Sequence, residues 1–296
     1  MDLRRVAGRA LTAAVGVCLL LSGCGGGGTG GREIVMNEPV RLTRTFEQGQ
    51  TIKYKLVSAG ELAIAMQGFD RVGSTQTEFR TTCDFKSVSP DAVIMEMRFD
   101  HAASSVSFGD DVTINESAGA LRGKTLEVTL KPDGEVVSFS GLSNEAYFDQ
   151  GAGEISLMMQ GMFPVLPEGP IDIGYTWQED LDVPDITSST DRDFIGETTY
   201  TVSGFKEKYG IPCVEVKTVS SFEFEGRVEQ QGEAWLMSGT GSGDGTILFS
   251  VNDGLILYST GITTMDFTGE GSTTAGAAAS TTLSAGLRVQ ATMELL

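Results

Sequence analysis

The C-terminal stretch alternates between two kinds of side chain, and this alternation constrains the fold more than any other feature. Apolar or small residues occupy every second position from Leu283 to Leu295, and mostly polar residues occupy the positions between them. A period of two sustained this long places one face against a core and the other in water, as in antiparallel sheets. The same alternation runs through residues 93–99 and through the hairpin 126–139, which turns at Pro132-Asp133-Gly134. The chain is therefore predicted to be all-β.

A weak internal repeat divides the chain into two similar halves. Gly49–Tyr54 parallels Gly174–Trp177, and the turn Asp133-Gly134 parallels Asn252–Gly254, at an offset near 120 residues. We expect a β-rich half over 34–142, a helical connector over 143–170 and a second β-rich half over 171–296. The halves form either one curved antiparallel sheet or half-barrel, or a sandwich, with one short helix between them.

The connector carries the one convincing helical pattern of the sequence. Its apolar residues recur at spacings of three, four and seven, and Pro164 and Pro167 end the pattern. Two interpretations remain open: a helix that fills the core against the sheet, or an adaptable wall of an apolar pocket, because methionine side chains repack easily. The residues that would line such a pocket are Met158, Met159, Met162 and Phe163.

The N-terminal segment has the layout of a secretion signal. Arg4, Arg5 and Arg9 precede an apolar run over 10–21, which is too short to span a bilayer. The run ends in Leu21-Ser22-Gly23-Cys24, which resembles the lipobox of bacterial lipoproteins. That resemblance implies cleavage before Cys24 and acylation of its sulfur. An ordinary signal peptide with a chance cysteine is the alternative. The Gly-rich residues that follow predict a flexible tether over 24–33.

The charge of the chain limits its partners. The formal net charge is −19, and removal of residues 1–23 would make it about −21. Such a surface repels phosphate backbones and anionic lipids, so nucleic acid is an unfavourable partner. Membrane affinity must then come from the acyl groups of Cys24.

Two cysteines remain after Cys18 leaves with the signal and Cys24 takes the lipid. Cys83 and Cys213 would lie in a compartment that permits disulfides. A disulfide between them and two separate buried thiols are equally compatible with the sequence.

No constellation of catalytic, metal-binding or nucleotide-binding residues stands out. His101 is the only histidine, which removes histidine-rich metal sites from consideration. The acidic stretch Glu179–Asp185, with Asp191 and Asp193, is either a solvated loop or a calcium site. We expect no catalytic residues, no metal and no cofactor, and hence a protein that is not an enzyme.

The join between the halves carries a resemblance of its own. Phe163-Pro164-Val165-Leu166-Pro167, followed by Gly174-Tyr175-Thr176-Trp177, resembles a pattern in uncharacterised bacterial lipoproteins with two β-rich halves. More distantly, the plan is similar to envelope lipoproteins in which a half-barrel cups a lipid tail. These resemblances imply a fold and a cell-envelope location. Gly25 after the acylated cysteine favours the outer membrane, with the domain facing the periplasm.

Two functions follow as expectations. The first is a non-catalytic lipoprotein that binds an apolar or lipid ligand in the concave face of the sheet. The second is an envelope scaffold or accessory subunit that binds other proteins through a sheet edge or face.

Overall fold

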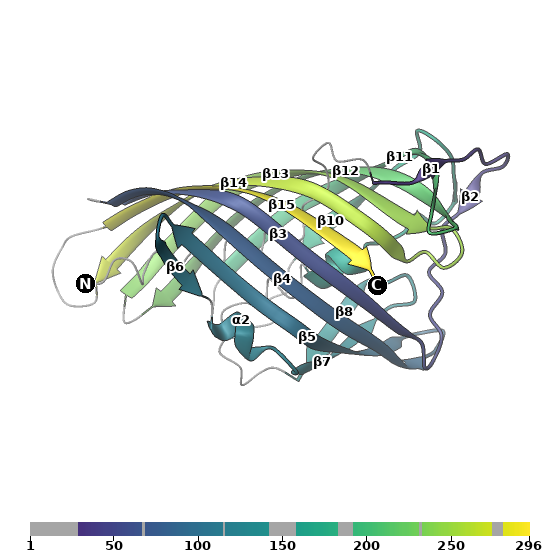
Figure 1. The fold of residues 1–296 in the computed structure, drawn as a ribbon, viewed down its shortest axis with the longest axis horizontal. Helices are drawn as coiled ribbons and strands as arrows, with labels where there is room; N and C mark the ends of the chain where they lie inside the picture. The colour runs from purple at the N-terminus through teal and green to yellow at the C-terminus, as the bar shows by residue number, and fades with distance from the viewer. Residues whose placement is uncertain are drawn as a thin grey trace.

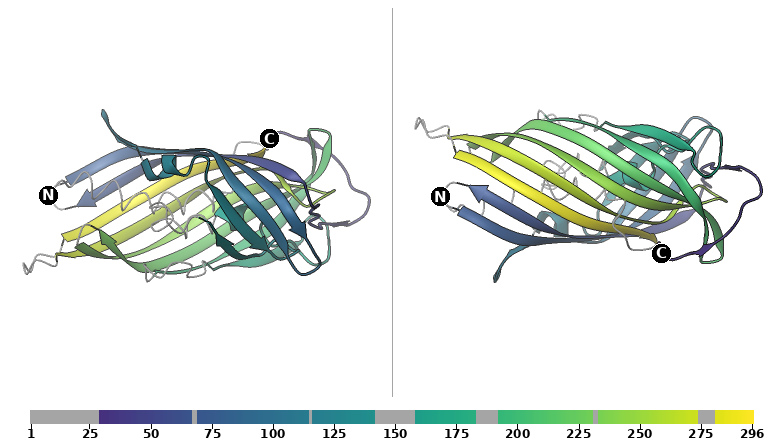
Figure 2. Two further views of the ribbon diagram at one scale, coloured as in Figure 1. Left: turned by 90° about the horizontal axis from the view of Figure 1, so that it is seen from below. Right: turned by 90° about the horizontal axis from the view of Figure 1, so that it is seen from above.

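A single antiparallel sheet of thirteen strands dominates the computed structural model of this protein. The structure describes residues 29–66, 69–114, 116–141, 158–182, 192–230, 233–273 and 281–296. The strands follow the order β1-β11-β12-β13-β14-β15-β3-β4-β5-β7-β8, with β10 beside β11 and β6 beside β5. The sheet curves strongly, so that β3–β5 and β7 lie across from β11–β13 (Figures 1 and 2). The all-β, curved-sheet prediction is confirmed, and the two halves share one sheet.

The strands of the sheet differ widely in length. The long ones are β3 (Thr51–Met66), β4 (Phe69–Val88), β5 (Val93–Phe108), β11 (Arg192–Lys208), β12 (Ile211–Gln230), β13 (Glu233–Ser250), β14 (Ile256–Thr273) and β15 (Thr281–Leu295). The short ones are β1 (Arg32–Glu33), β6 (Asp111–Ile114), β7 (Thr125–Leu130), β8 (Val136–Ser140) and β10 (Thr176–Asp182). A separate two-stranded sheet pairs β2 (Val40–Arg41) with β9 (Pro170–Ile171).

The two halves have the same connectivity. β3-β4-β5-β7-β8 and β10-β11-β12-β13-β14 are each a run of sequential neighbours, and β15 joins them by pairing with both β14 and β3. Gly49 and Gly174 both have positive φ before the first strand of their half, and each donates its N–H across to the second strand. This correspondence supports the duplication that the sequence predicts.

The alternation in sequence becomes a division between two faces. In β3 the even-numbered residues are buried almost throughout, and most odd-numbered residues are exposed. β15 repeats this pattern, with its apolar residues from Leu283 to Met293 at most 6% exposed. The apolar side chains fill the concave face, whereas the outer face is mostly polar. Burial of these side chains, at roughly 25 cal/mol per Å² of apolar area, is the main force that holds the curve.

Two short helices lie among the described residues. The first, α2 (Glu116–Ala120), was not predicted, and it buries Ala118 while Leu121 just after it is also buried. The second covers 158–162 and packs against the concave face, as the sequence predicted. The part of the connector over 143–157 falls outside the described residues. Neither helix is long or apolar enough to cross a membrane.

Candidate functional site

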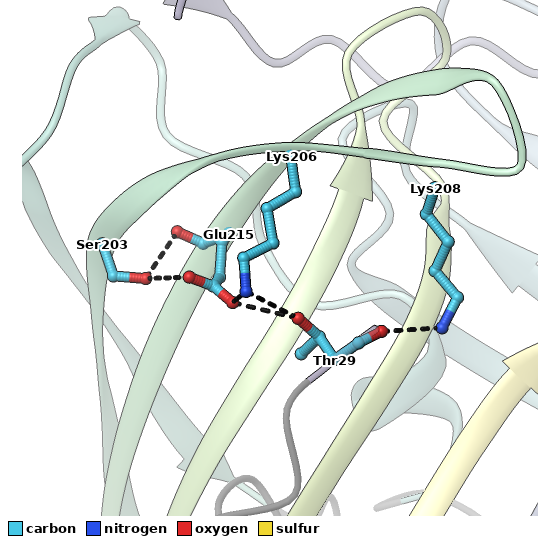
Figure 3. Close-up of polar contacts among 5 residues, drawn as sticks. All are labelled: Thr29, Ser203, Lys206, Lys208 and Glu215. Carbon is cyan, nitrogen blue, oxygen red and sulfur yellow. Dashed lines mark hydrogen bonds and ion pairs between the residues drawn. The ribbon is translucent and has the colours of Figure 1, made fainter. Parts of the chain in front are cut away.

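The start of the described chain is fastened to the outer face of the sheet. Thr29 is 3% exposed and lies on β11 and β12 (Figure 3). Its hydroxyl donates to Glu215 (3.0 Å) and accepts from Lys206 (3.1 Å), while its carbonyl oxygen accepts from Lys208 (2.9 Å). We call Thr29, Ser203, Lys206, Lys208 and Glu215 the N-terminal clamp.

One ion pair and one cation–π contact stabilise the charges of the clamp. Lys206 forms an ion pair with Glu215 in which both side chains are less than a fifth exposed. Partial burial raises the pKa of Glu215, but hydrogen bonds from Lys206, Thr29 and Ser203 outweigh it and hold the pKa below its usual value. Burial lowers the pKa of Lys208. Its ammonium lies 3.7 Å from the ring centroid of Tyr258, where a cation–π contact offsets part of the lost hydration.

A β-bulge in β11 builds one side of the clamp. The pairing of β11 with β12 shifts between Val202 and Gly204, which leaves Ser203 as the extra residue. The Ser203 hydroxyl then lies 3.1 Å from a carboxylate oxygen of Glu215 and 3.2 Å from its backbone carbonyl. The bulge therefore aims Ser203 at the carboxylate that binds Thr29.

The residues after Thr29 continue along β11. β1 pairs with β11 over Arg32–Glu33, and the N–H of Ile34 donates to the carbonyl of Phe205. A Cβ at Gly31 would lie 3.0 Å from the carbonyl oxygen of Glu207, so glycine allows this close approach. Residues 29–33, which we expected within a flexible tether, thus lie against the sheet.

The two remaining cysteines lie on opposite faces of the sheet. Cys83 belongs to the concave core, whereas Cys213 packs with Leu248 and Leu257 on the outer face near the clamp. Both thiols are free and fully buried. The sheet separates them, which corresponds to the second alternative left open by the sequence, two separate buried thiols. Burial raises the pKa of Cys83 to about 12 and raises that of Cys213 as well, which suppresses thiolate chemistry.

A second polar cluster lies under the concave face, around Arg44. Arg44 is 7% exposed, and its Nη1 donates to the carbonyl oxygen of Asp133 (2.7 Å). Its Nε and Nη2 have no hydrogen-bond partner among the described residues. Burial lowers the pKa of Arg44 to about 10, and nearby Tyr54 and Glu179 oppose this shift. The guanidinium therefore stays charged with two donors unused.

Glu179 is the carboxylate of this cluster. It accepts hydrogen bonds from the Tyr200 hydroxyl (2.7 Å) and from the Val165 N–H (3.2 Å). Burial raises its pKa to about 6 despite these hydrogen bonds. Trp177 stacks on Tyr200 with ring centroids 4.9 Å apart and donates to the Val165 carbonyl (3.0 Å). The segments Phe163–Pro167 and Gly174–Trp177, which form the join between the halves, therefore contact each other directly.

The proposed ligand-lining residues lie in the packed core beside this cluster. Met158, Met159, Met162 and Phe163 are at most 4% exposed. The Phe163 ring lies 5.8 Å from the Arg44 guanidinium, in cation–π geometry. The helix thus fills the concave face in this structure, which is the core-filling interpretation of its sequence pattern.

A hollow of the surface lies elsewhere, on the outer face. It measures about 560 Å³ and crosses β11–β15. Its rim carries Glu223, Glu225 and Asp266, whose side-chain carboxylates form no ion pair with another described residue. We call this hollow the acidic trough. None of the four connector residues lines it.

The remaining sequence candidates are not brought together. His101 lies on β5 opposite Arg80. Of the acidic stretch, residues 183–191 fall outside the described residues, and Asp193 pairs with Glu225 in the sheet. Within the described ranges no three His, Cys, Asp or Glu side chains are placed to hold a metal ion. The sequence does not predict Arg44, Lys206 and Lys208 as site residues, because no spacing marks an isolated basic residue that becomes buried.

Comparisons with known proteins do not assign this chain to a family. No protein-family model and no curated protein matches the chain. Among solved structures, an outer membrane channel from Pseudomonas putida F1 is 9% identical with a TM-score of 0.25, over 89% of this chain and all of that one. A DUF1329 family protein from Desulfovibrio piger is 10% identical with a TM-score of 0.15, over 79% of this chain and 83% of that one. Similarities this low assign neither a family nor a function.

Proposed function

We propose that this chain is a lipid-anchored, non-catalytic protein of the bacterial cell envelope that binds an apolar or lipid ligand at its concave face. The anchor is the acyl-modified Cys24, in the outer membrane with the domain facing the periplasm. The signal layout before Cys24 and the mostly polar outer face of the sheet support this proposal. A polar exterior does not itself enter a bilayer, so the acyl groups supply the attachment.

The main support for a bound ligand is the unused hydrogen-bonding capacity of Arg44. A buried donor without a partner costs roughly 1–3 kcal/mol, and more when it is charged. Arg44 has two such donors beside an apolar helix and an apolar sheet face. A ligand with an apolar body and an oxygen-bearing head would satisfy the donors and bury its chain against the methionines.

Entry of the ligand requires the 158–163 segment to leave its present contacts. Methionine side chains make this repacking less costly than branched residues would, because their three rotatable bonds adapt to varied shapes. The ligand replaces the contacts that Met158, Met159 and Met162 now make with the core.

Two experiments test the two parts separately. Incorporation of labelled palmitate by the wild type and its loss in Cys24→Ala test the anchor. Mass spectrometry of lipids extracted from protein purified from its native membrane tests the ligand. We expect a bound species beyond the acyl anchor, which Arg44→Met removes and the exposed control Arg41→Met retains. Wild-type protein that carries only its own acyl chains would contradict the ligand proposal.

The second candidate function is an envelope scaffold that binds other proteins. The tight packing of the 158–163 segment favours it, because the side chains of Met158, Met159, Met162 and Phe163 are at most 4% exposed. β8 (Val136–Ser140) is the last strand of the sheet, and its edge away from β7 is paired with no described strand. A strand of a partner protein would add to this edge. Crosslinking in intact cells through a photoreactive residue at Val137, which is 53% exposed, would capture the partner.

A further inference from the structure

The covalent distance between the proposed lipid and the clamp is short. Five Cα–Cα steps separate Cys24 from Thr29, which span at most about 18 Å when fully extended. Thr29 itself is fixed to the outer face by three hydrogen bonds from two strands. The bilayer surface must therefore lie within about this distance of the N-terminal clamp.

The clamp lies at one end of a long sheet. Lys206 and Lys208 directly precede the β11–β12 turn at Tyr209-Gly210, and Lys206 lies opposite Cys213 in β12. The residue of β12 that pairs with Leu236 is Arg227, fourteen residues beyond Cys213. At about 3.3 Å per residue, these rows are about 46 Å apart along the strands. The anchor cannot hold both ends equally close to a bilayer unless the outer face lies flat on it.

The chemistry of the two regions distinguishes the upright from the flat arrangement. Near the clamp Arg32 forms an ion pair with Glu207, and the side chains of Val35 and Tyr209 are exposed. Tyrosine favours the interface between water and headgroups. The acidic trough lies farther along the outer face, and its unpaired carboxylates would face the headgroups if the sheet lay flat. Anionic lipids repel such a surface.

We propose that the end of the sheet bearing the β11–β12 turn faces the bilayer, with Val35 and Tyr209 at headgroup level and the acidic trough held away in water. The partner surface is the lipid bilayer that holds the acyl groups. This inference rests on the proposed acylation of Cys24. It assigns the clamp the role of converting a flexible attachment into a defined orientation.

The test measures the depth of three exposed positions in the acylated protein. Val35→Cys, Val219→Cys and Leu236→Cys each receive a thiol-reactive fluorophore, while the native Cys83 and Cys213 are buried. Val219 lies six residues, or about 20 Å, beyond Cys213 along β12. The labelled proteins are reconstituted into vesicles of phosphatidylcholine and an anionic phospholipid that carry a quencher on the headgroups. We expect severalfold stronger quenching at position 35 than at 236, with 219 near the level of 236.

Equal quenching at all three positions would show a sheet lying flat and would overturn the proposal, as would the strongest quenching at 236. A matched variant inserts twenty Gly and Ser residues between Gly28 and Thr29, which keeps both the acyl groups and the clamp. The longer linker between Cys24 and Thr29 should lower the quenching at position 35 to the level at position 236. If quenching at position 35 stays stronger than at 236 after the insertion, the short linker is not the cause of the difference, and the proposal is overturned.

Vesicle flotation of the same samples separates the two proposals. Protein that floats without a depth gradient overturns the orientation alone. Protein that fails to float, and takes up no labelled palmitate, overturns the anchor and the orientation together.

Discussion

Substitution of Gly60 by alanine should destabilise the seam that joins the two halves of the sheet. Gly60 lies in β3 opposite Val289 of β15, the pairing through which the C-terminal strand meets the first half. A Cβ at this position would lie 2.3 Å from the carbonyl oxygen of Arg288 and 2.9 Å from the Cα of Val289. Both contacts are with backbone, so the clash cannot be relieved by rotation of a side chain.

The geometry sets the size of the effect. Real Cβ contacts rarely fall below 3.4 Å, so β15 must move away from β3 by about 1 Å. Overpacking of this kind costs typically 1–3 kcal/mol, and we expect about 3 kcal/mol because the strand shift also weakens neighbouring ladder hydrogen bonds. For a domain of this size, that loss lowers the Tm by about 10 °C.

The assay is urea denaturation followed by the fluorescence of Trp177 and Trp235. The matched control is Gly119→Ala in α2, where a Cβ would meet nothing within 4 Å. There the smaller entropy of the unfolded chain should stabilise the protein by about 0.4–1 kcal/mol. If Gly60→Ala were neutral or stabilising, β3 and β15 would not be paired in this register.

Three further predictions concern titratable groups. Because the pKa of Glu179 is raised to about 6 from 4.5, its contribution to stability is present below pH 4.5 and is lost as pH rises through 6. The Glu179→Gln variant should therefore gain about 2 kcal/mol on the wild type between pH 4.5 and pH 7.5, measured by urea denaturation at both values; an unchanged difference would refute the burial of this carboxylate. Glu215→Gln should weaken the clamp and expose Gly31 to limited proteolysis, whereas the exposed control Glu223→Gln should be cut no faster than wild type. Cys83 and Cys213 should resist a thiol reagent in the native protein and release two thiols per chain in denaturant; their absence there would indicate a disulfide.

Local patterns in the sequence determine the elements and faces of this protein. The alternation from Leu283 to Leu295 fixes which side chains of β15 are buried, because successive side chains of a strand point to opposite faces. The glycines at 49, 134, 174 and 254 adopt the positive φ that their turns require. The connector pattern places Met158–Phe163 on an apolar surface. Cys24 is recognised from adjacent residues alone, and its acylation stays a prediction.

The tertiary structure decides which of these elements meet. The clamp joins Thr29 to Lys206, Lys208 and Glu215, residues more than 170 positions away, and no periodicity encodes that pairing. In the sequence Arg44 is one polar residue among many. Only the tertiary structure shows that it is buried and that two of its hydrogen-bond donors have no partner among the described residues. The separation of Cys83 and Cys213 likewise depends on which face each residue reaches once the strands are paired. Period and turn chemistry act over a few residues, whereas strand order and burial arise from contacts between distant segments, so the sequence alone predicts the sheet and only the folded chain reveals its sites.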